Sequence, residues 1–125
     1  MSARLFDYAY IAATIVLTVY GQVVLKWRVR GYGALPEETI AKFRFLFGLF
    51  LDPFVLSGIF AAFLASLAWM AAMTKFELTH AYPFMSLNFV VVLLLSVWLL
   101  GEPLTIPKVL GVALIVAGTV VVARG

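Results

Sequence analysis

The sequence predicts an all-α membrane protein with four transmembrane helices. Of the 125 residues, 65% are hydrophobic and 12% are charged, and the mean hydropathy is +1.11. So few polar side chains cannot cover the surface of a soluble globule. A helix that crosses the roughly 30 Å hydrocarbon core needs about 20 apolar residues, and the chain offers four such runs. We expect a single domain with little mass outside the bilayer.

The four predicted spans cover about 8–27, 53–74, 81–100 and 106–123. Backbone groups in lipid must be hydrogen-bonded within their own segment, and none of these runs alternates as barrel strands do, so each is predicted to be a helix. The first run is long, follows Asp7 and has no small-residue cleavage site. We therefore expect it to stay in the mature protein rather than to act as a cleaved signal peptide.

The first connection is the long one, and its glycines and Pro36 are expected to end the first helix. Further along, the segment 37–51 places Ile40, Phe43, Phe47 and Phe50 at helical spacing. This pattern predicts an amphipathic helix that lies in the membrane interface. The alternative is that the segment extends the second span toward its N-terminus.

The formal net charge of +3 is interpreted as basic residues that flank membrane spans. Six lysines and arginines fall in the first and third connections against three elsewhere, which places the long connection in the cytoplasm by the positive-inside rule. No polybasic patch interleaved with aromatic residues indicates nucleic acid, so membrane lipids are the expected surroundings. The absence of cysteine excludes thiolate metal sites, and the one histidine, His80, cannot make a metal site alone, so no metal or cofactor is expected.

Polar residues inside two spans are the candidate functional residues. Gln22 and Lys26 stand four apart in "YGQVVLKWR", so they share one helical face. In "THAYPFMSLNF" the sequence places Pro83 in the first turn of the third helix, where unpaired N–H groups suit an anionic ligand. The alternatives are that Lys26 only reaches toward lipid headgroups, and that the polar residues of the third span hydrogen-bond to neighbouring helices.

Small residues mark the expected helix contacts. Thr105 and Pro107 predict the start of the fourth helix, and Gly111 and Gly118 then lie seven residues apart on one face. Because helices in lipid associate through close backbone approach, this stripe predicts a helix interface. The second span has small residues at similar spacing, which make it a candidate partner of the fourth: Gly58, Ala61, Ala65 and Ala72.

The stretch from Ala81 to Val122, with "AYPFMSLNF" and the following "GEP" as its most specific parts, resembles the small four-helix flippase subunits ArnE and ArnF. "GQVVLK" matches their Gly-Gln-x-x-x-Lys pattern, and the resemblance favours ArnE. These subunits belong to the EamA drug/metabolite transporter superfamily. The resemblance implies a transporter of a polyprenyl-phosphate-linked sugar, such as undecaprenyl-phosphate aminoarabinose, across the bacterial inner membrane for lipid A modification. It also implies a homodimer or a heterodimer with a homologous subunit.

Under this resemblance, Lys26 neutralises the substrate phosphate with the aid of Arg28, and Gln22 hydrogen-bonds the phosphate or the sugar. The other candidate substrate-binding residues line a polar path for the head group or, for the last of them, meet a sugar amino group: Tyr20, Tyr82, Ser86, Asn88 and Glu102. No bond is made or broken in such a passage. We therefore expect no enzyme and no catalytic residue.

Two other functions stay open. The small multidrug resistance proteins have a similar glycine pattern in the fourth helix, which is reproduced here by Gly111, Leu114, Ile115 and Gly118 as the expected dimer interface. They exchange protons for cationic drugs through a glutamate in their first helix, and the first span here has no glutamate. The remaining alternative is a non-transporting assembly subunit, which would tolerate replacement of both Gln22 and Lys26.

Overall fold

The computed structural model describes residues 2–125 and confirms the predicted class, since its secondary structure over these residues is helical. The helices are α1 (Ser2–Tyr32), α2 (Thr39–Phe50), α3 (Pro53–Met73), α4 (Leu78–Met85), α5 (Leu87–Leu99) and α6 (Ile106–Arg124). Four segments of this part of the chain are long and apolar enough to cross a membrane: Leu5–Tyr32, Pro53–Met73, Leu78–Leu99 and Ile106–Arg124.

Helix α1 is longer than the span that the sequence predicted. Its 31 residues reach about 46 Å at 1.5 Å per residue, which exceeds the hydrocarbon thickness of about 30 Å. The helix is therefore longer than one crossing requires, and Arg28 and Arg30 lie on its last turns, after the end of the predicted span. The helix ends before Gly33, whose φ of +88° is a left-handed conformation that glycine adopts without a Cβ clash.

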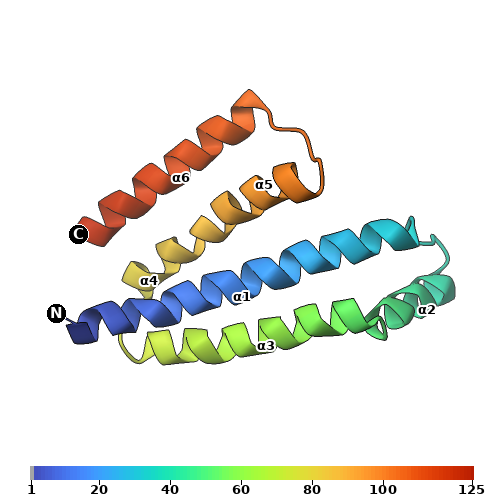
Figure 1. The fold of residues 1–125 in the computed structure, drawn as a ribbon, viewed down its shortest axis with the longest axis horizontal. Coiled ribbons are helices and arrows are strands. Elements are labelled where there is room, and N and C mark those ends of the chain that lie inside the picture. The colour runs from blue at the N-terminus through green and yellow to red at the C-terminus, as the bar shows by residue number, and fades with distance from the viewer. Residues whose placement is uncertain (1) are drawn as a thin grey trace.

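Helices α2 and α3 are separate, so the segment after Pro36 forms its own helix rather than a continuation of the second span (Figure 1). The break lies at Asp52, whose backbone is extended and whose Oδ1 accepts hydrogen bonds from the backbone N–H groups of Phe54 and Val55. An aspartate N-cap followed by proline is a strong helix start. Helix α2 leaves the side chains of Phe43 and Phe47 about two-thirds exposed.

The third span consists of two helices that meet at Ser86. Helix α4 begins at Leu78, so Pro83 lies inside it and not in its first turn. The expectation that Pro83 stands in the first turn of the third helix is therefore wrong, and the N-terminus of α5 lies instead at Ser86. A proline in a helix interior lacks an N–H donor and crowds the preceding turn, and here the chain tightens beyond it, with the Ser86 N–H donating to the Pro83 carbonyl at 3.0 Å.

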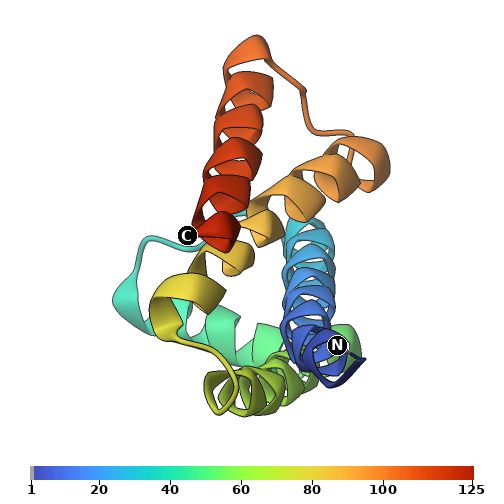
Figure 2. The same ribbon diagram turned by 90° about the vertical axis from the view of Figure 1, so that its left-hand side faces the viewer.

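Helices α1 and α3 lie side by side and form the most extensive helix contact of the described chain (Figures 1 and 2). Their backbones come close at Gly21 and Gly58, where a Cβ added to Gly21 would stand 2.9 Å from the Gly58 carbonyl oxygen. Helix α3 buries a row of small residues: Gly58, Ala61, Ala65 and Ala72. The prediction that this row contacts the fourth span is wrong, because α1 occupies that place.

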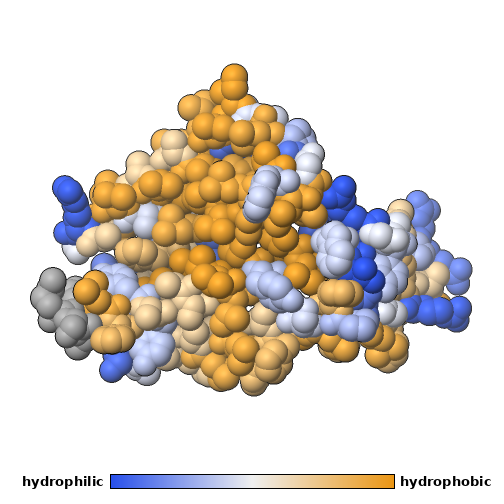
Figure 3. Space-filling view, in the orientation of Figure 1, coloured by the Kyte–Doolittle hydropathy of each residue, from blue (hydrophilic) through white to orange (hydrophobic). Residues whose placement is uncertain are grey.

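Helices α4, α5 and α6 form a second layer, in which α6 folds back beside α4 (Figure 2). The Thr119 hydroxyl donates to the Pro83 carbonyl at 3.2 Å and so joins α6 to the proline-containing helix. The outer face of α6 stays open, with Leu114 74% exposed and Val121 70% exposed. Figure 3 shows a broad hydrophobic band with hydrophilic residues gathered toward the ends, as a surface in contact with lipid requires.

Candidate functional site

A row of polar side chains runs along one face of α1. Gln22, Lys26 and Arg30 are spaced four residues apart, so they lie one above another on the helix. Gln22 borders a narrow hollow of about 120 Å³ between α1 and α3, beside the contact of Gly21 with Gly58. All three polar side chains are exposed, so they are available to a ligand.

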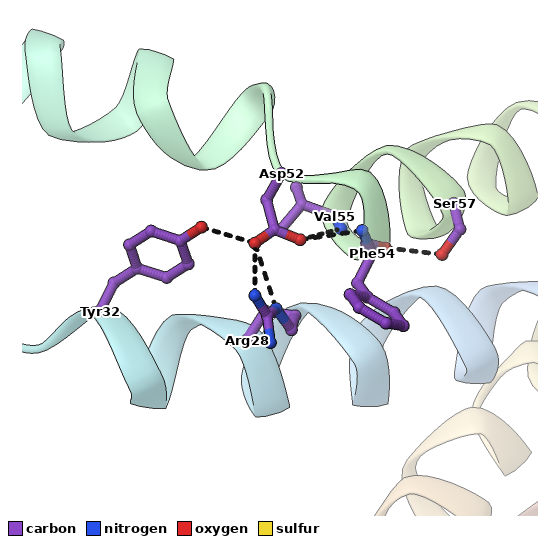
Figure 4. Close-up of polar contacts among 6 residues, drawn as sticks. All are labelled: Arg28, Tyr32, Asp52, Phe54, Val55 and Ser57. Carbon is purple, nitrogen blue, oxygen red and sulfur yellow. Dashed lines mark hydrogen bonds and ion pairs between the residues drawn. The ribbon is translucent and has the colours of Figure 1, made fainter.

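Arg28 lies on a different face of α1 and is held by Asp52 at the start of α3 (Figure 4). Its Nη2 and Nε donate to Asp52 Oδ2 at 2.7 and 3.2 Å, and the Tyr32 hydroxyl donates to the same oxygen at 2.5 Å. Three aromatic rings surround the guanidinium, with centroids 4.9 Å (Phe54), 5.2 Å (Trp27) and 5.9 Å (Tyr32) from its central carbon. The positive charge of Arg28 is thus already compensated within the chain.

The Asp52 carboxylate is well stabilised in its ionised form. Hydrogen bonds from Arg28 and then from Tyr32 lower its pKa well below the ordinary range, and the two backbone N–H groups of the helix cap act in the same direction. No functional role was predicted for Asp52, although an aspartate directly before a proline is a recognisable helix-start signal. Its pairing with Arg28 joins residues 24 positions apart and depends on the tertiary fold.

Arg30 contacts the end of α5 at the same end of the molecule. Its Nη1 donates to the Leu100 carbonyl at 2.8 Å. A guanidinium carries five N–H donors, and this contact uses one of them. Glu102 follows in the connection to α6, where its side chain is half-buried and its backbone N–H donates to the Ser96 carbonyl.

An apolar groove of about 460 Å³ separates α1 from α5. Its walls are formed by α1 side chains from Ile15 to Val24 and by Val91, Leu95 and Leu99 of α5. Tyr20 lines this groove, and its hydroxyl is 2.9 Å from the hydroxyl of Ser57. A second hollow of about 300 Å³ shares Val23, Val24 and Leu99 with the groove and continues it to Trp27 and Leu100.

Three predicted residues of the third span come together in one cavity. Tyr82, Ser86 and Asn88 line a space of about 390 Å³ with Met85 and with Trp69 of α3. The rings of Trp69 and Tyr82 meet edge to face with centroids 6.1 Å apart. The Asn88 Oδ1 atom is buried without a hydrogen-bond partner among the described residues. Trp69 was not predicted, because one aromatic residue in an apolar span carries no signal of its own.

This cavity and the α1 row lie at different depths. Leu99 is level with Val23 and Val24, since the three line the same hollow. Asn88 precedes Leu99 by eleven residues, which corresponds to about 16 Å along a helix axis. The cavity is therefore separate from Lys26, and Glu102, at the far end of α5, lies apart from it as well.

The glycine stripe of α6 faces open space in the single chain. A Cβ added to Gly111 or Gly118 would meet no atom of the described residues within 4 Å. Leu114 is largely exposed on the same helix, whereas Ile115 is half-buried and its carbonyl accepts a hydrogen bond from Thr119. The stripe thus makes no close packing contact within the part of the chain that is described.

Comparison with known proteins matches residues 8–124 to the EamA-like transporter family. A protein of Pseudomonas aeruginosa (strain UCBPP-PA14) is 31% identical over 117 residues, which cover 93% of this chain and 96% of that protein. A protein of Pseudomonas fluorescens (strain Pf-5) is 29% identical over 108 residues, or 86% and 89% of the two chains. Both are named probable 4-amino-4-deoxy-L-arabinose-phosphoundecaprenol flippase subunit ArnE.

No solved structure matches the chain. The family match covers nearly the whole sequence and agrees with the four helices that can span a membrane. It also agrees with the resemblance seen in the sequence. This chain is a multi-pass membrane protein that belongs to the EamA-like transporter family.

Proposed function

We propose that the chain is a flippase subunit that moves 4-amino-4-deoxy-L-arabinose-phosphoundecaprenol across the bacterial inner membrane, for modification of lipid A in the cell envelope. The observation that carries this proposal is similarity along almost the full length to relatives named for that substrate. The α1 face with Gln22 and Lys26 supports it, because a lysine beside a hydrogen-bonding amide suits an anionic phosphodiester.

The groups of this lipid correspond to distinct parts of the molecule. Lys26 neutralises the phosphate and Gln22, one turn away, hydrogen-bonds the phosphate or the sugar. Arg28 serves the α1–α3 junction, since its charge is paired with Asp52. The cavity lined by Tyr82, Ser86 and Asn88 then accepts the sugar at a second depth. The passage makes and breaks no covalent bond, so the subunit is not an enzyme.

The subunit works as a dimer, either with itself or with a homologous four-helix subunit. The groove between α1 and α5 of a single chain measures about 460 Å³, and the α6 glycine stripe has no close neighbour among residues 2–125. Close approach of a second helix to Gly111 and Gly118 completes the transport path. Helix α2 lies in the membrane interface, near the end of α1 where Lys26 binds the phosphate, and its phenylalanine face is in contact with lipid.

Flipping measured in proteoliposomes, with the homologous partner subunit co-reconstituted, tests the role of Lys26. Lys26→Ala leaves the phosphate without its charge partner in a poorly hydrated site, and we expect flipping to fall roughly 30-fold. Lys26→Arg keeps the charge and retains part of the activity. Lys75→Ala is the matched control, because Lys75 is an exposed lysine in the connection after α3.

The alternative role of Lys26 predicts a different result. A lysine that only reaches toward lipid headgroups predicts that Lys26→Ala is nearly silent. Wild-type flipping by a correctly inserted, dimeric Lys26→Ala protein would reject the phosphate site. Absence of flipping by the wild-type complex, with the partner present, would reject the proposed function itself.

A further inference from the structure

We propose that Arg30 and the groove between α1 and α5 bind the prenyl-phosphate part of the substrate, with the phosphate at Arg30 and the first isoprene units in the groove. This inference rests on the proposed function. It adds to Lys26 a second phosphate-binding residue and gives the lipid tail a place in the fold.

The groove has the length and surface that an extended hydrocarbon chain needs. With its continuation it follows α1 from Ile15 to Trp27, which is about 18 Å along the helix. Its walls are almost entirely aliphatic, and the hydroxyl of Tyr20 is turned to Ser57. A branched hydrocarbon fills such a surface without leaving a polar group unpaired.

Cationic groups stand at one end of the groove. Val16, Val23 and Arg30 are seven residues apart in turn, so Arg30 lies in line with the groove wall. Its Nη1 binds the carbonyl of Leu100, a residue that lines the continuation of the groove. Lys26 lies one turn before Arg30 on the same side of α1. An anion at the mouth of the groove is thus within reach of both cations.

The chemistry of the mouth distinguishes a prenyl phosphate from a phospholipid. In a prenyl phosphate the phosphate oxygen is bonded directly to the first carbon of the tail. In a phospholipid a glycerol ester separates the phosphate from the acyl chains, and those ester groups would lie against apolar walls. Arg30 touches Leu100, which lines the continuation of the groove, so the charge lies close to the apolar surface and this spacing fits the prenyl phosphate.

Photocrosslinking of the full chain in nanodiscs tests where the tail lies. The probe is undecaprenyl phosphate with a diazirine in its first isoprene units, and crosslinked peptides are identified by mass spectrometry. We expect crosslinks on α1 and α5 at Val23, Leu95 and Leu99, and few on exposed α6 residues such as Leu114 and Val121. Unlabelled undecaprenyl phosphate competes with the probe, whereas phosphatidylglycerol does not.

Variants test the two ends of the site. Arg30→Gln keeps a donor for the Leu100 carbonyl but loses the charge, and we expect the affinity for undecaprenyl phosphate to fall about tenfold. Arg44→Gln on α2 is the control of equal charge. Val16→Trp places a large ring over the groove from a position that is 66% exposed, and it reduces crosslinking on α5. Val121→Trp on α6 is its control.

Equal crosslinking of α5 and α6, or equal competition by phosphatidylglycerol, would show that bulk lipid fills the groove and would overturn the inference. Unchanged affinity in Arg30→Gln would overturn the phosphate assignment. Flipping of the sugar lipid is measured separately. A complex that flips normally while the probe labels other helices refutes this site alone, and a complex that binds the probe in the groove without flipping refutes the proposed function.

Discussion

Gly21→Ala is the sharpest perturbation that the structure offers, because it places one methyl group in a close contact between the backbones of α1 and α3. The added Cβ would stand 2.9 Å from the carbonyl oxygen of Gly58. That obstacle is backbone, so no side chain can rotate away and the two helices must separate. The reciprocal change, Gly58→Ala, meets the Gly21 carbonyl oxygen at 3.3 Å and needs a smaller adjustment.

The magnitude follows from the packing of α1 on α3. Relief of the clash moves the helices apart by about half an ångström, which forfeits roughly a quarter of the dispersion energy of contacts along the seam. Overpacking of this kind costs about 1–3 kcal/mol, and alanine has a helix propensity better than that of glycine by up to about 1 kcal/mol. We expect Gly21→Ala to lower the free energy of unfolding by up to about 2 kcal/mol, and Gly58→Ala to lower it by less.

Reversible unfolding in mixed micelles, followed by circular dichroism, measures the difference. Gly118→Ala is the matched control, since a Cβ at that position meets nothing within 4 Å among the described residues. It should leave the stability of the single chain unchanged or raise it by up to about 1 kcal/mol. Equal unfolding curves for Gly21→Ala and Gly118→Ala would refute the close approach of α1 and α3.

Three further predictions concern other parts of the chain. The Asp52 carboxylate has a lowered pKa in the fold, so its contribution to stability is complete above the ordinary aspartate pKa of about 3.9 and declines as the pH falls below it. The free energy of unfolding, measured from pH 3 to 7, should therefore depend less on pH in Asp52→Asn than in the wild type. An unchanged pH dependence would contradict the pairing of Asp52 with Arg28. Gly111→Leu combined with Gly118→Leu should abolish intersubunit crosslinking along α6 while the chain still folds; persistent crosslinking would place the dimer interface elsewhere. Spin labels at Phe43 and Phe47 should report a shallow membrane depth, and labels in bulk water or at the bilayer centre would exclude an interfacial α2.

The sequence was most informative where one physical requirement dominates. Hydropathy alone located the four spans, because each crossing needs a long uninterrupted apolar run. The start of the fourth helix at Thr105 was correctly predicted, and the Thr105 hydroxyl caps α6 by accepting from the Lys108 backbone N–H at 3.4 Å. The ends of α1 were less predictable, because a charge that ends the apolar run does not end a helix, and Arg28 and Arg30 continue it.

The sequence did not predict which spans contact one another. A row of small residues indicates that some helix approaches closely but not which one, and the row of α3 faces α1 rather than α6. The different contacts of Arg28 and Arg30 were unpredictable for the same reason. Two residues apart on a helix they face different directions, and the partners Asp52 and Leu100 that distinguish them come from distant segments.

Helix α1 connects the stability of the fold with the proposed transport path. One side of it packs on α3 at Gly21, a second borders the groove toward α5, and the row from Gln22 to Arg30 lies between them. Gln22 borders the hollow created where α1 meets α3, so any separation of these helices changes the surroundings of Gln22 as well. Gly21→Ala should therefore impair flipping even where the protein remains folded, whereas Gly58→Ala, with its smaller shift, should impair it less. The flipping rates of both variants are measured on folded protein at equal density in the membrane. A lower rate for Gly21→Ala than for Gly58→Ala would show that transport depends on the packing of α1 against α3. Equal rates would show that the substrate face of α1 works independently of that packing.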